Sequence, residues 1–145
     1  MNIKGIYKAI IDNAVRGKVM LYGELNDAYI GIGLDAYGAF FIPKSQFIFD
    51  PEKLQPKSCA FSRVLPEQEP TPATFTNDMK VLDSGATLRK LTTGKSWTWV
   101  NTDRIKYFDK KAEYRMTTDV GAILVYEHDI LVGMFMPSRK AEGEK

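Results

Sequence analysis

The sequence predicts an α+β fold in which two units, each a helix with antiparallel strands, pack together as one domain. Three observations support this prediction: an apolar pattern with helical spacing at the start, alternating apolar patterns after it, and a similar order of elements in the second half. We expect unit one at about residues 1–50, a Pro-rich connection at about 51–77, unit two at about 78–139 and a charged tail at 140–145.

Length and composition fit a single globular domain, residues 1–145. Of the 145 residues, 44% are hydrophobic and 26% are charged, and the formal net charge is +2. Domains commonly hold about 100–150 residues, and a chain of this size buries a core without disulfides. The charge balance does not by itself indicate nucleic-acid binding, although basic residues gathered on one face would.

The cysteine count and the hydropathy bear on the cellular setting. Cys59 is the only cysteine, which excludes an internal disulfide and fits a reducing compartment. Residues 1–18 lack the apolar core and the cleavage site of a secretory signal. No run approaches the roughly 20 apolar residues that a membrane span needs. We therefore expect a cytoplasmic protein that has no membrane partner.

The first predicted element is an amphipathic helix. Asn2 can cap its start, and Gly17 can end it in a left-handed conformation. Apolar residues recur along it at intervals of three and four, namely Ile3, Ile6, Tyr7, Ile10, Ile11, Ala14 and Val15.

After this helix the apolar period changes to two, which predicts an antiparallel meander packed on the helix. Asn26-Asp27 and Asp35-Ala36 mark the turns. Gly31 and Gly33 share one face of the second strand, where we expect a close approach by another group or a bend. The three strands are expected at residues 19–25, 28–34 and 37–43.

The middle of the chain is rich in proline, since six of the seven prolines lie between residues 43 and 72. A strand or helical turn is possible near residues 46–49. We otherwise expect an irregular surface connection, with a partner-binding segment as the alternative.

The second unit is predicted to contain a short helix at residues 102–112, capped by Asn101 or Thr102. Glu127-His128-Asp129 reads as the polar turn of the last hairpin, with the histidine facing solvent. Strands are expected within residues 79–91, on both sides of Asp83-Ser84-Gly85, and at 96–101, 113–118, 122–128 and 130–137.

The final strands of the two units have similar endings. Residues 38–43 read Gly-Ala-Phe-Phe-Ile-Pro, and residues 133–137 read Gly-Met-Phe-Met-Pro. This similarity indicates an internal repeat of one supersecondary unit, with chance as the alternative.

Residues 99–139 resemble the last unit of a bacterial DNA polymerase sliding clamp. The resemblance rests on short motifs and covers the first half only by architecture. The matching residues are Val100-Asn101, Ile105, Tyr107-Phe108, residues 122–126 and Met136-Pro137-Ser138-Arg139.

The resemblance implies a DNA-clamp-like domain whose two helices lie on one face and contact double-stranded DNA. Contacts of this kind go to phosphates, independently of base sequence, and weaken with salt. A solvated helix face is the alternative explanation of the same charges. The residues implied are Lys4, Lys8, Arg16, Lys18, Arg104, Lys106, Lys110 and Lys111.

Clamps also have a peptide-binding pocket beside the Met-Pro-X-Arg segment, which implies partner binding at Met136, Pro137 and Arg139. A clamp subunit joins three such domains, whereas this chain has room for one. A closed ring would therefore require self-association of about six copies.

No catalytic motif is readable in the sequence. His128 is the only histidine, a Gly-X-Ser-X-Gly elbow is absent, and three adjacent residues on a hairpin tip do not converge readily on a metal. Trp97 and Trp99 share a strand face, either as a stacking platform or as half-buried core. We expect no cofactor and no metal site.

The sequence therefore favours a non-catalytic binding or assembly module that contacts DNA through a basic helix face. The alternatives are a protein–protein interaction module without nucleic acid and an enzyme of unrecognised type.

Overall fold

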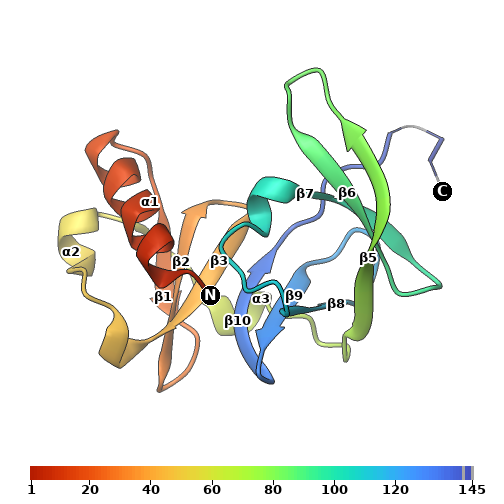
Figure 1. The fold of residues 1–145 in the computed structure, drawn as a ribbon. Helices are drawn as coiled ribbons and strands as arrows, with labels where there is room; N and C mark the ends of the chain where they lie inside the picture. Colours follow the sequence, from red (N-terminus) through yellow and green to blue (C-terminus); the bar gives the residue numbers. More distant parts are fainter. Residues whose placement is uncertain (142, 145) are drawn as a thin grey trace.

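The fold is a mixed α and β structure built on one long, mostly antiparallel sheet. A computed structural model describes residues 1–141 and 143–144. Over these residues the sheet has ten strands in the order β4-β1-β2-β3-β10-β9-β8-β5-β6-β7 (Figure 1). The α+β class predicted from the sequence is confirmed at this level.

The N-terminal helix α1 (Ile3–Val15) forms as predicted. The Asn2 side chain accepts a hydrogen bond from the Gly5 N–H at 2.9 Å, and Gly17 ends the helix with a φ of +69°. Ile6 and Ile10 are completely buried on the face that packs against the sheet. The apolar spacing of the sequence therefore identified both the helix and its inner face.

Three antiparallel strands follow α1, as the alternating pattern predicts: β1 (Leu21–Glu24), β2 (Tyr29–Asp35) and β3 (Gly38–Pro43). The expected close approach to Gly31 is confirmed, because a Cβ there would lie 2.5 Å from a ring carbon of Phe61.

The proline-rich middle contains short elements: the 3₁₀ turn η1 (Lys44–Gln46), α2 (Pro51–Leu54), β4 (Lys57–Ser58) and α3 (Phe61–Val64). The expectation that the irregular connection extends to residue 77 is wrong. Residues 71–77 belong to β5 (Thr71–Val81), which pairs with two neighbouring strands. Pro72 lies near the start of this strand, where a missing N–H is best tolerated.

The second half supplies β6 (Thr87–Thr92), β7 (Trp97–Asn101), β8 (Glu113–Met116), β9 (Ile123–Glu127) and β10 (Ile130–Phe135). These strands match the predicted segments. The turn that was expected at residues 83–85 is present between β5 and β6, with Gly85 at a φ of +88°.

The prediction of a helix at residues 102–112 is wrong. Only a 3₁₀ turn, η2 (Thr102–Arg104), forms there, followed by further turns. Asn101 does cap it, by accepting from the Asp103 N–H. Tyr107 and Phe108 are neighbours, yet each ring centroid lies 5.5 Å from that of Phe40. Adjacent side chains of a regular helix point in different directions, whereas the irregular turns at residues 105–108 bring both to one ring.

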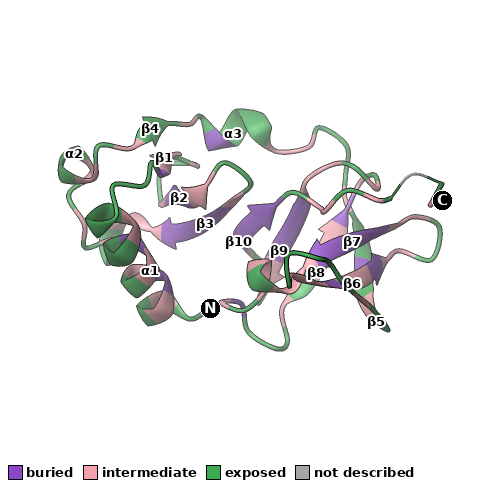
Figure 2. Ribbon diagram, turned by 90° about the horizontal axis from the view of Figure 1, so that it is seen from above, coloured by how far each residue is buried: buried purple, intermediate pink, exposed green. Residues whose placement is uncertain are grey.

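The two halves join where β3 pairs with β10, through Phe40 with Gly133 and Gly38 with Phe135. These are the two strands whose endings look alike in sequence. Figure 2 shows α1 on one side of this layer and α3 on the other. One core, which includes Ile32, Phe40 and Val125, runs through both halves beneath α1, and a smaller core around Phe41 and Phe61 lies beneath α3.

The strands of the second half curl around their own part of the core. The β5–β6 hairpin projects from the body of the molecule (Figure 1). Just after β10, the Ser138 N–H donates to the Trp99 carbonyl of β7 at 2.8 Å, so the chain returns to the last strand of the sheet. Within the described residues, α1 has no α-helical counterpart in this half, so the expected pair of equivalent helices does not form.

Candidate functional site

A largely apolar cavity lies between α3 and the paired strands β3 and β10. Its volume is about 220 Å³. It is lined chiefly by carbon-rich side chains of Leu21, Ala36, Tyr37, Ala39, Cys59, Phe61, Val64, Ala122, Met134, Phe135 and Met136, with Gly38. We call it the α3 pocket.

The wall of the α3 pocket depends on a close fit between Gly31 and Phe61. Phe61 is 2% exposed and meets Phe41 edge to face, with 5.7 Å between ring centroids. Because Gly31 has no side chain, the Phe61 ring can lie directly on β2. This contact anchors the four-residue helix α3, which has little stability of its own.

The rim of the α3 pocket carries exposed apolar side chains. Tyr37 is 62% exposed, Val64 is 49% exposed and Met136 is 39% exposed. The Met136 N–H donates to the Tyr37 carbonyl at 2.8 Å, which holds both residues at the rim. Exposed apolar residues that surround a concave surface are typical of binding sites.

Arg63 on α3 is exposed and precedes the rim residue Val64 in sequence. Arg139 is exposed three residues after Met136 and lines the neighbouring cavity together with Asp119 and Lys140. Within the pocket wall, burial raises the pKa of the Cys59 thiol. That shift favours the neutral thiol, so Cys59 contributes an apolar surface.

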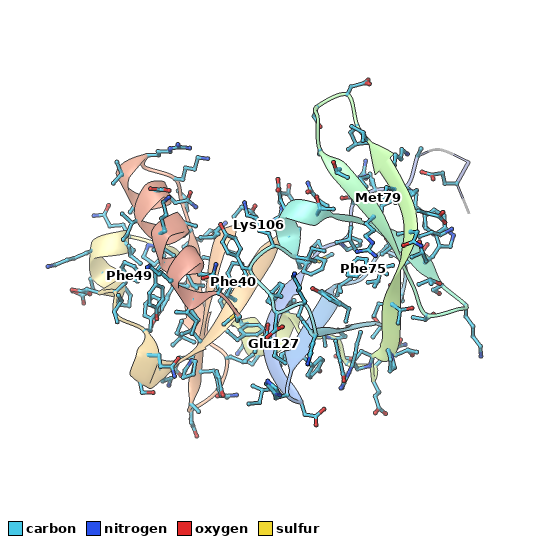
Figure 3. The ribbon with its side chains drawn as sticks, in the orientation of Figure 1. Phe40, Phe49, Phe75, Met79, Lys106 and Glu127 are labelled. Carbon is cyan, nitrogen blue, oxygen red and sulfur yellow. The ribbon has the colours of Figure 1, made fainter. Side chains whose placement is uncertain are left out.

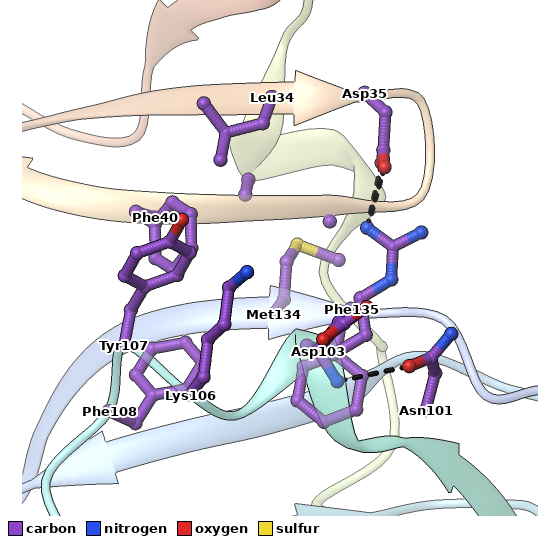
Figure 4. Close-up of a pocket in the computed structure, with 13 residues that line it drawn as sticks. Leu34, Asp35, Phe40, Asn101, Asp103, Lys106, Tyr107, Phe108, Met134 and Phe135 are labelled. Carbon is purple, nitrogen blue, oxygen red and sulfur yellow. Dashed lines mark hydrogen bonds and ion pairs between the residues drawn. The ribbon is translucent and has the colours of Figure 1, made fainter. Parts of the chain in front are cut away.

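A second, more polar pocket of about 260 Å³ lies across the β3–β10 junction, beside η2. The two Asp35 oxygens lie 2.8 and 2.9 Å from Arg104 Nη1, and a dashed line in Figure 4 marks this interaction of Asp35 at the edge of the pocket. Phe40 and Tyr107 form part of its wall, with Lys106 beside Tyr107. Arg104 is therefore occupied by an intramolecular ion pair, which sequence inspection did not anticipate.

The residues that were predicted to contact DNA do not form a two-helix face. Lys4, Lys8 and Arg16 are exposed on or just after α1, as is Lys18 in the following loop. In the second half, Arg104 is half-buried in its ion pair, whereas Lys106, Lys110 and Lys111 are exposed in turns. Figure 3 shows Lys106 between α1 and the β5–β6 hairpin.

The exposed side of α1 is also partly apolar. Ile11 is 51% exposed and Val15 is 82% exposed, one helical turn apart. A surface dedicated to phosphate contacts is rich in basic and polar groups, so these side chains weaken the case for α1 as a DNA-contacting helix.

The predicted turn forms at His128 and Asp129, whereas Glu127 is the last residue of β9. His128 and Asp129 are exposed and have φ angles of +52° and +63°. Glu127 is not part of the solvated tip: its carboxylate accepts from the Met1 ammonium at 2.6 Å and from the Asp109 N–H at 2.8 Å. The described residues contain no group of three histidine, cysteine or acidic side chains placed to bind a metal.

Of the predicted partner-binding residues, Met136 lines the α3 pocket, and all three, Met136, Pro137 and Arg139, line a neighbouring cavity of about 740 Å³. Sequence inspection missed Phe61, Val64 and Cys59. These apolar residues are visible as a cluster in the proline-rich middle of the sequence. Where the cluster packs on the sheet, however, depends on the contact of Phe61 with Gly31, which is distant in the chain.

Comparisons with protein-family models, with curated proteins and with solved structures gave no match for this chain. None of the helices in the described part of the chain combines the length and the apolar character needed to cross a membrane.

Proposed function

We propose that this protein is a binding module that holds a short apolar segment of a protein partner in the α3 pocket. The observation that carries the proposal is the apolar cavity of about 220 Å³ with Tyr37, Val64 and Met136 exposed at its rim. Apolar anchors seated in preformed pockets supply most of the binding energy of such interfaces.

Two exposed arginines narrow the chemistry of the expected partner. Arg63 precedes the rim residue Val64 in sequence, and Arg139 lines the cavity next to the α3 pocket. We therefore expect the bound segment to carry one or two large apolar side chains next to acidic residues. The resemblance to sliding clamps supports this proposal, because those proteins bind peptides beside a Met-Pro-X-Arg segment.

The test is selection of peptides from a random display library on the full chain, followed by affinity measurement. Selected peptides should share a large apolar residue flanked by Asp or Glu. Val64→Glu combined with Met136→Glu should weaken binding by about tenfold or more, because it places charge at the anchors. Both positions are already partly exposed, so the fold should persist.

The matched control is Val81→Glu, because Val81 is 71% exposed at the end of β5 and is absent from the lining of the α3 pocket. This variant should bind the selected peptides like the wild type. Peptides without an apolar anchor, or an equal loss of affinity in the control, would exclude the α3 pocket as the docking site.

The second candidate function is contact with double-stranded DNA, with a sliding-clamp-like assembly as its fullest form. It is favoured by the exposure of Lys4, Lys8, Arg16 and Lys18 near α1 and of Lys106, Lys110 and Lys111 in the second half. Arg104 would contribute only if its ion pair with Asp35 opened.

Duplex DNA affinity should then fall steeply with salt, and Lys8→Glu, Arg16→Glu, Lys106→Glu and Lys110→Glu together should abolish it. Retention of duplex binding by this variant would exclude the basic-face proposal. Light scattering tests the clamp-like form, because a closed ring requires an assembly of about six chains.

A further inference from the structure

The C-terminal segment lies against the strands at the far end of the sheet, β5 to β7. Figures 1 and 2 both show the chain after β10 running beside these strands. The segment is attached first through its backbone, where the Ser138 N–H donates to the Trp99 carbonyl. Since β7 is the last strand in the sheet order, this contact extends the sheet at its edge.

A carboxylate of the same segment lies in a small set of donors. Trp99 Nε1 donates to the two oxygens of Glu144 at 3.0 and 3.3 Å, and Lys80 Nζ lies 3.2 Å from one of them. The Ala141 N–H also donates to Glu144, at 2.7 Å. The hydrogen bond from Ala141, followed by those from Trp99 and Lys80, lowers the pKa of the Glu144 carboxyl. The group bound at this place is therefore an ionised carboxylate.

The segment also covers the neighbouring tryptophan. Lys140 Nζ lies 4.0 Å from the centroid of a Trp97 ring, and Lys90 Nζ lies 4.4 Å from a Trp97 ring centroid. Trp97 and Trp99 meet edge to face, with 5.5 Å between centroids. Backbone, ammonium and carboxylate groups of one short segment thus each have a complementary partner on the β6–β7 surface.

We propose that this surface, which we call the Trp99 site, binds an acidic peptide segment of a partner protein. The chain's own C-terminal segment occupies it as a displaceable cap. The proposal does not depend on the α3 pocket. It rests on the contacts of the cap, which show the chemistry of the site: a strand edge beside an indole N–H and an ammonium group that together hold a carboxylate.

Charge distinguishes a peptide from a nucleic acid as the occupant. The surface itself contributes two lysines beside the tryptophans: Lys90 pairs with Asp78, whereas Lys80 pairs with Glu144 of the cap. Displacement of the cap therefore leaves one ammonium group beside the indole N–H, which suits a single carboxylate better than a row of phosphates. The strand edge and the carboxylate donors match a peptide instead.

We expect the part of the cap that carries Glu144 to be displaceable. Its ion pair with Lys80 is partly exposed, and exposed ion pairs contribute little to stability. A tethered segment nevertheless competes at an effective concentration in the millimolar range. A partner peptide must therefore exceed this competition, and loss of the Glu144 contact should make the Trp99 site more available.

The experiment uses a fluorescent synthetic peptide with the sequence of residues 136–145 as the probe, added to full-length chains. Glu144→Lys in the protein places like charges together at Lys80 and releases the cap. We expect this variant to bind the probe about fivefold more tightly than the wild type, measured by anisotropy. A probe in which Glu144 is replaced by Gln should bind the Glu144→Lys protein no more tightly than it binds the wild type.

Two further variants assign the effect. Glu69→Lys makes the same charge change at an exposed position, and we expect it to bind the probe like the wild type. Lys80→Gln added to Glu144→Lys should remove the gain. The indole N–H resonance of Trp99 reports the cap directly, and it should shift in Glu144→Gln without unfolding.

Equal probe affinity in the wild type and Glu144→Lys would overturn the proposal, as would an unchanged Trp99 resonance in Glu144→Gln. An oligonucleotide that displaces the probe more effectively than unlabelled peptide would reassign the site to nucleic acid. Concentration-dependent dimers that disappear in Glu144→Lys would identify a second copy of this chain as the occupant, and would also overturn the assignment to a partner protein.

Discussion

At the scale of the residue, two glycines allow aromatic rings to pack directly on the sheet. A Cβ at Gly31 would lie 2.5 Å from the Phe61 ring, and a Cβ at Gly133 would lie 2.5 Å from the Phe108 ring. The two rings cover opposite faces of the sheet, because Phe61 belongs to the small core and Phe108 to the large one. The first contact forms the α3 pocket, and the second holds the turn after η2 against β10.

Ionisation of Tyr114 should make the stability of the folded protein depend on pH. Burial, assisted by the negative charge of Glu127, raises the pKa of Tyr114 from 10.0 to about 12. In the unfolded chain this hydroxyl ionises near pH 10, whereas in the folded protein it stays neutral until about pH 12. The unfolded state therefore loses its proton first, and the stability that is fully present below pH 10 is lost as the pH rises through this window.

We expect the free energy of unfolding to fall between about pH 9 and about pH 11, and to fall less in Tyr114→Phe. Urea denaturation at the two pH values measures the difference. The phenylalanine variant keeps the ring contacts with Phe75 and Phe135 and removes only the ionisable group. An identical fall in both proteins would contradict the assignment of this pH dependence to Tyr114.

At the scale of the element, the β9–β10 hairpin is held in a turn that its residues do not favour. Glu127 pairs with Ile130, so the loop between them has two residues, His128 and Asp129, both with positive φ. Turns of this kind prefer Asn-Gly, because asparagine and glycine tolerate the left-handed region better than other residues. The strands, with Leu124 and Val125 buried, therefore determine the hairpin more than its turn does.

His128→Asn combined with Asp129→Gly should increase the free energy of unfolding by about 1 kcal/mol, because it relieves the cost of left-handed backbone at two positions. Chemical denaturation measures the change.

Asp27→Gly serves as the control for this substitution. Asp27 also lies in a hairpin turn, but its φ is not positive, so glycine there should only increase the flexibility of the unfolded chain and lower stability. A gain of stability in the control, or none in the double variant, would contradict this explanation.

At the scale of the whole molecule, the pairing of β3 with β10 and a shared core join the two halves, so we expect them to unfold together. The large core includes Ile6 and Ile32 from the first half and Val100 and Phe135 from the second. Phe135 is 2% exposed and lies in β10 opposite Gly38. Its loss should therefore affect both halves together.

We expect Phe135→Ala to reduce the free energy of unfolding by about 3–5 kcal/mol, as for other large buried aromatic residues, and to leave one unfolding transition. Tryptophan fluorescence reports the second half through β7, and hydrogen exchange in β2 reports the first. Loss of protection in the second half alone would show that the halves unfold independently.

The sequence predictions succeeded where local interactions determine the structure and failed where contacts between distant residues do. Helix α1 and strands β1, β2, β3, β9 and β10 could be predicted because their apolar periods are local and uninterrupted. The segment at residues 102–112 could not, because contacts of Tyr107 and Phe108 with Phe40 favour turns over a helix. Of the α3 pocket, only Met136 was predicted, with Pro137 and Arg139 in the neighbouring cavity, since the other walls come from distant segments.

The sequence by itself determined the α+β class, the first helix with its cap, the meander and the solvent-exposed turn at His128. These features depend on residue spacing and turn chemistry within a few positions of one another. Only the tertiary structure decided that α3 packs on Gly31, that Arg104 pairs with Asp35 and that the C-terminal segment reaches Trp99. The physical reason is that these contacts join residues far apart in the chain, and the spacing of apolar residues along the sequence gives no information about such pairs.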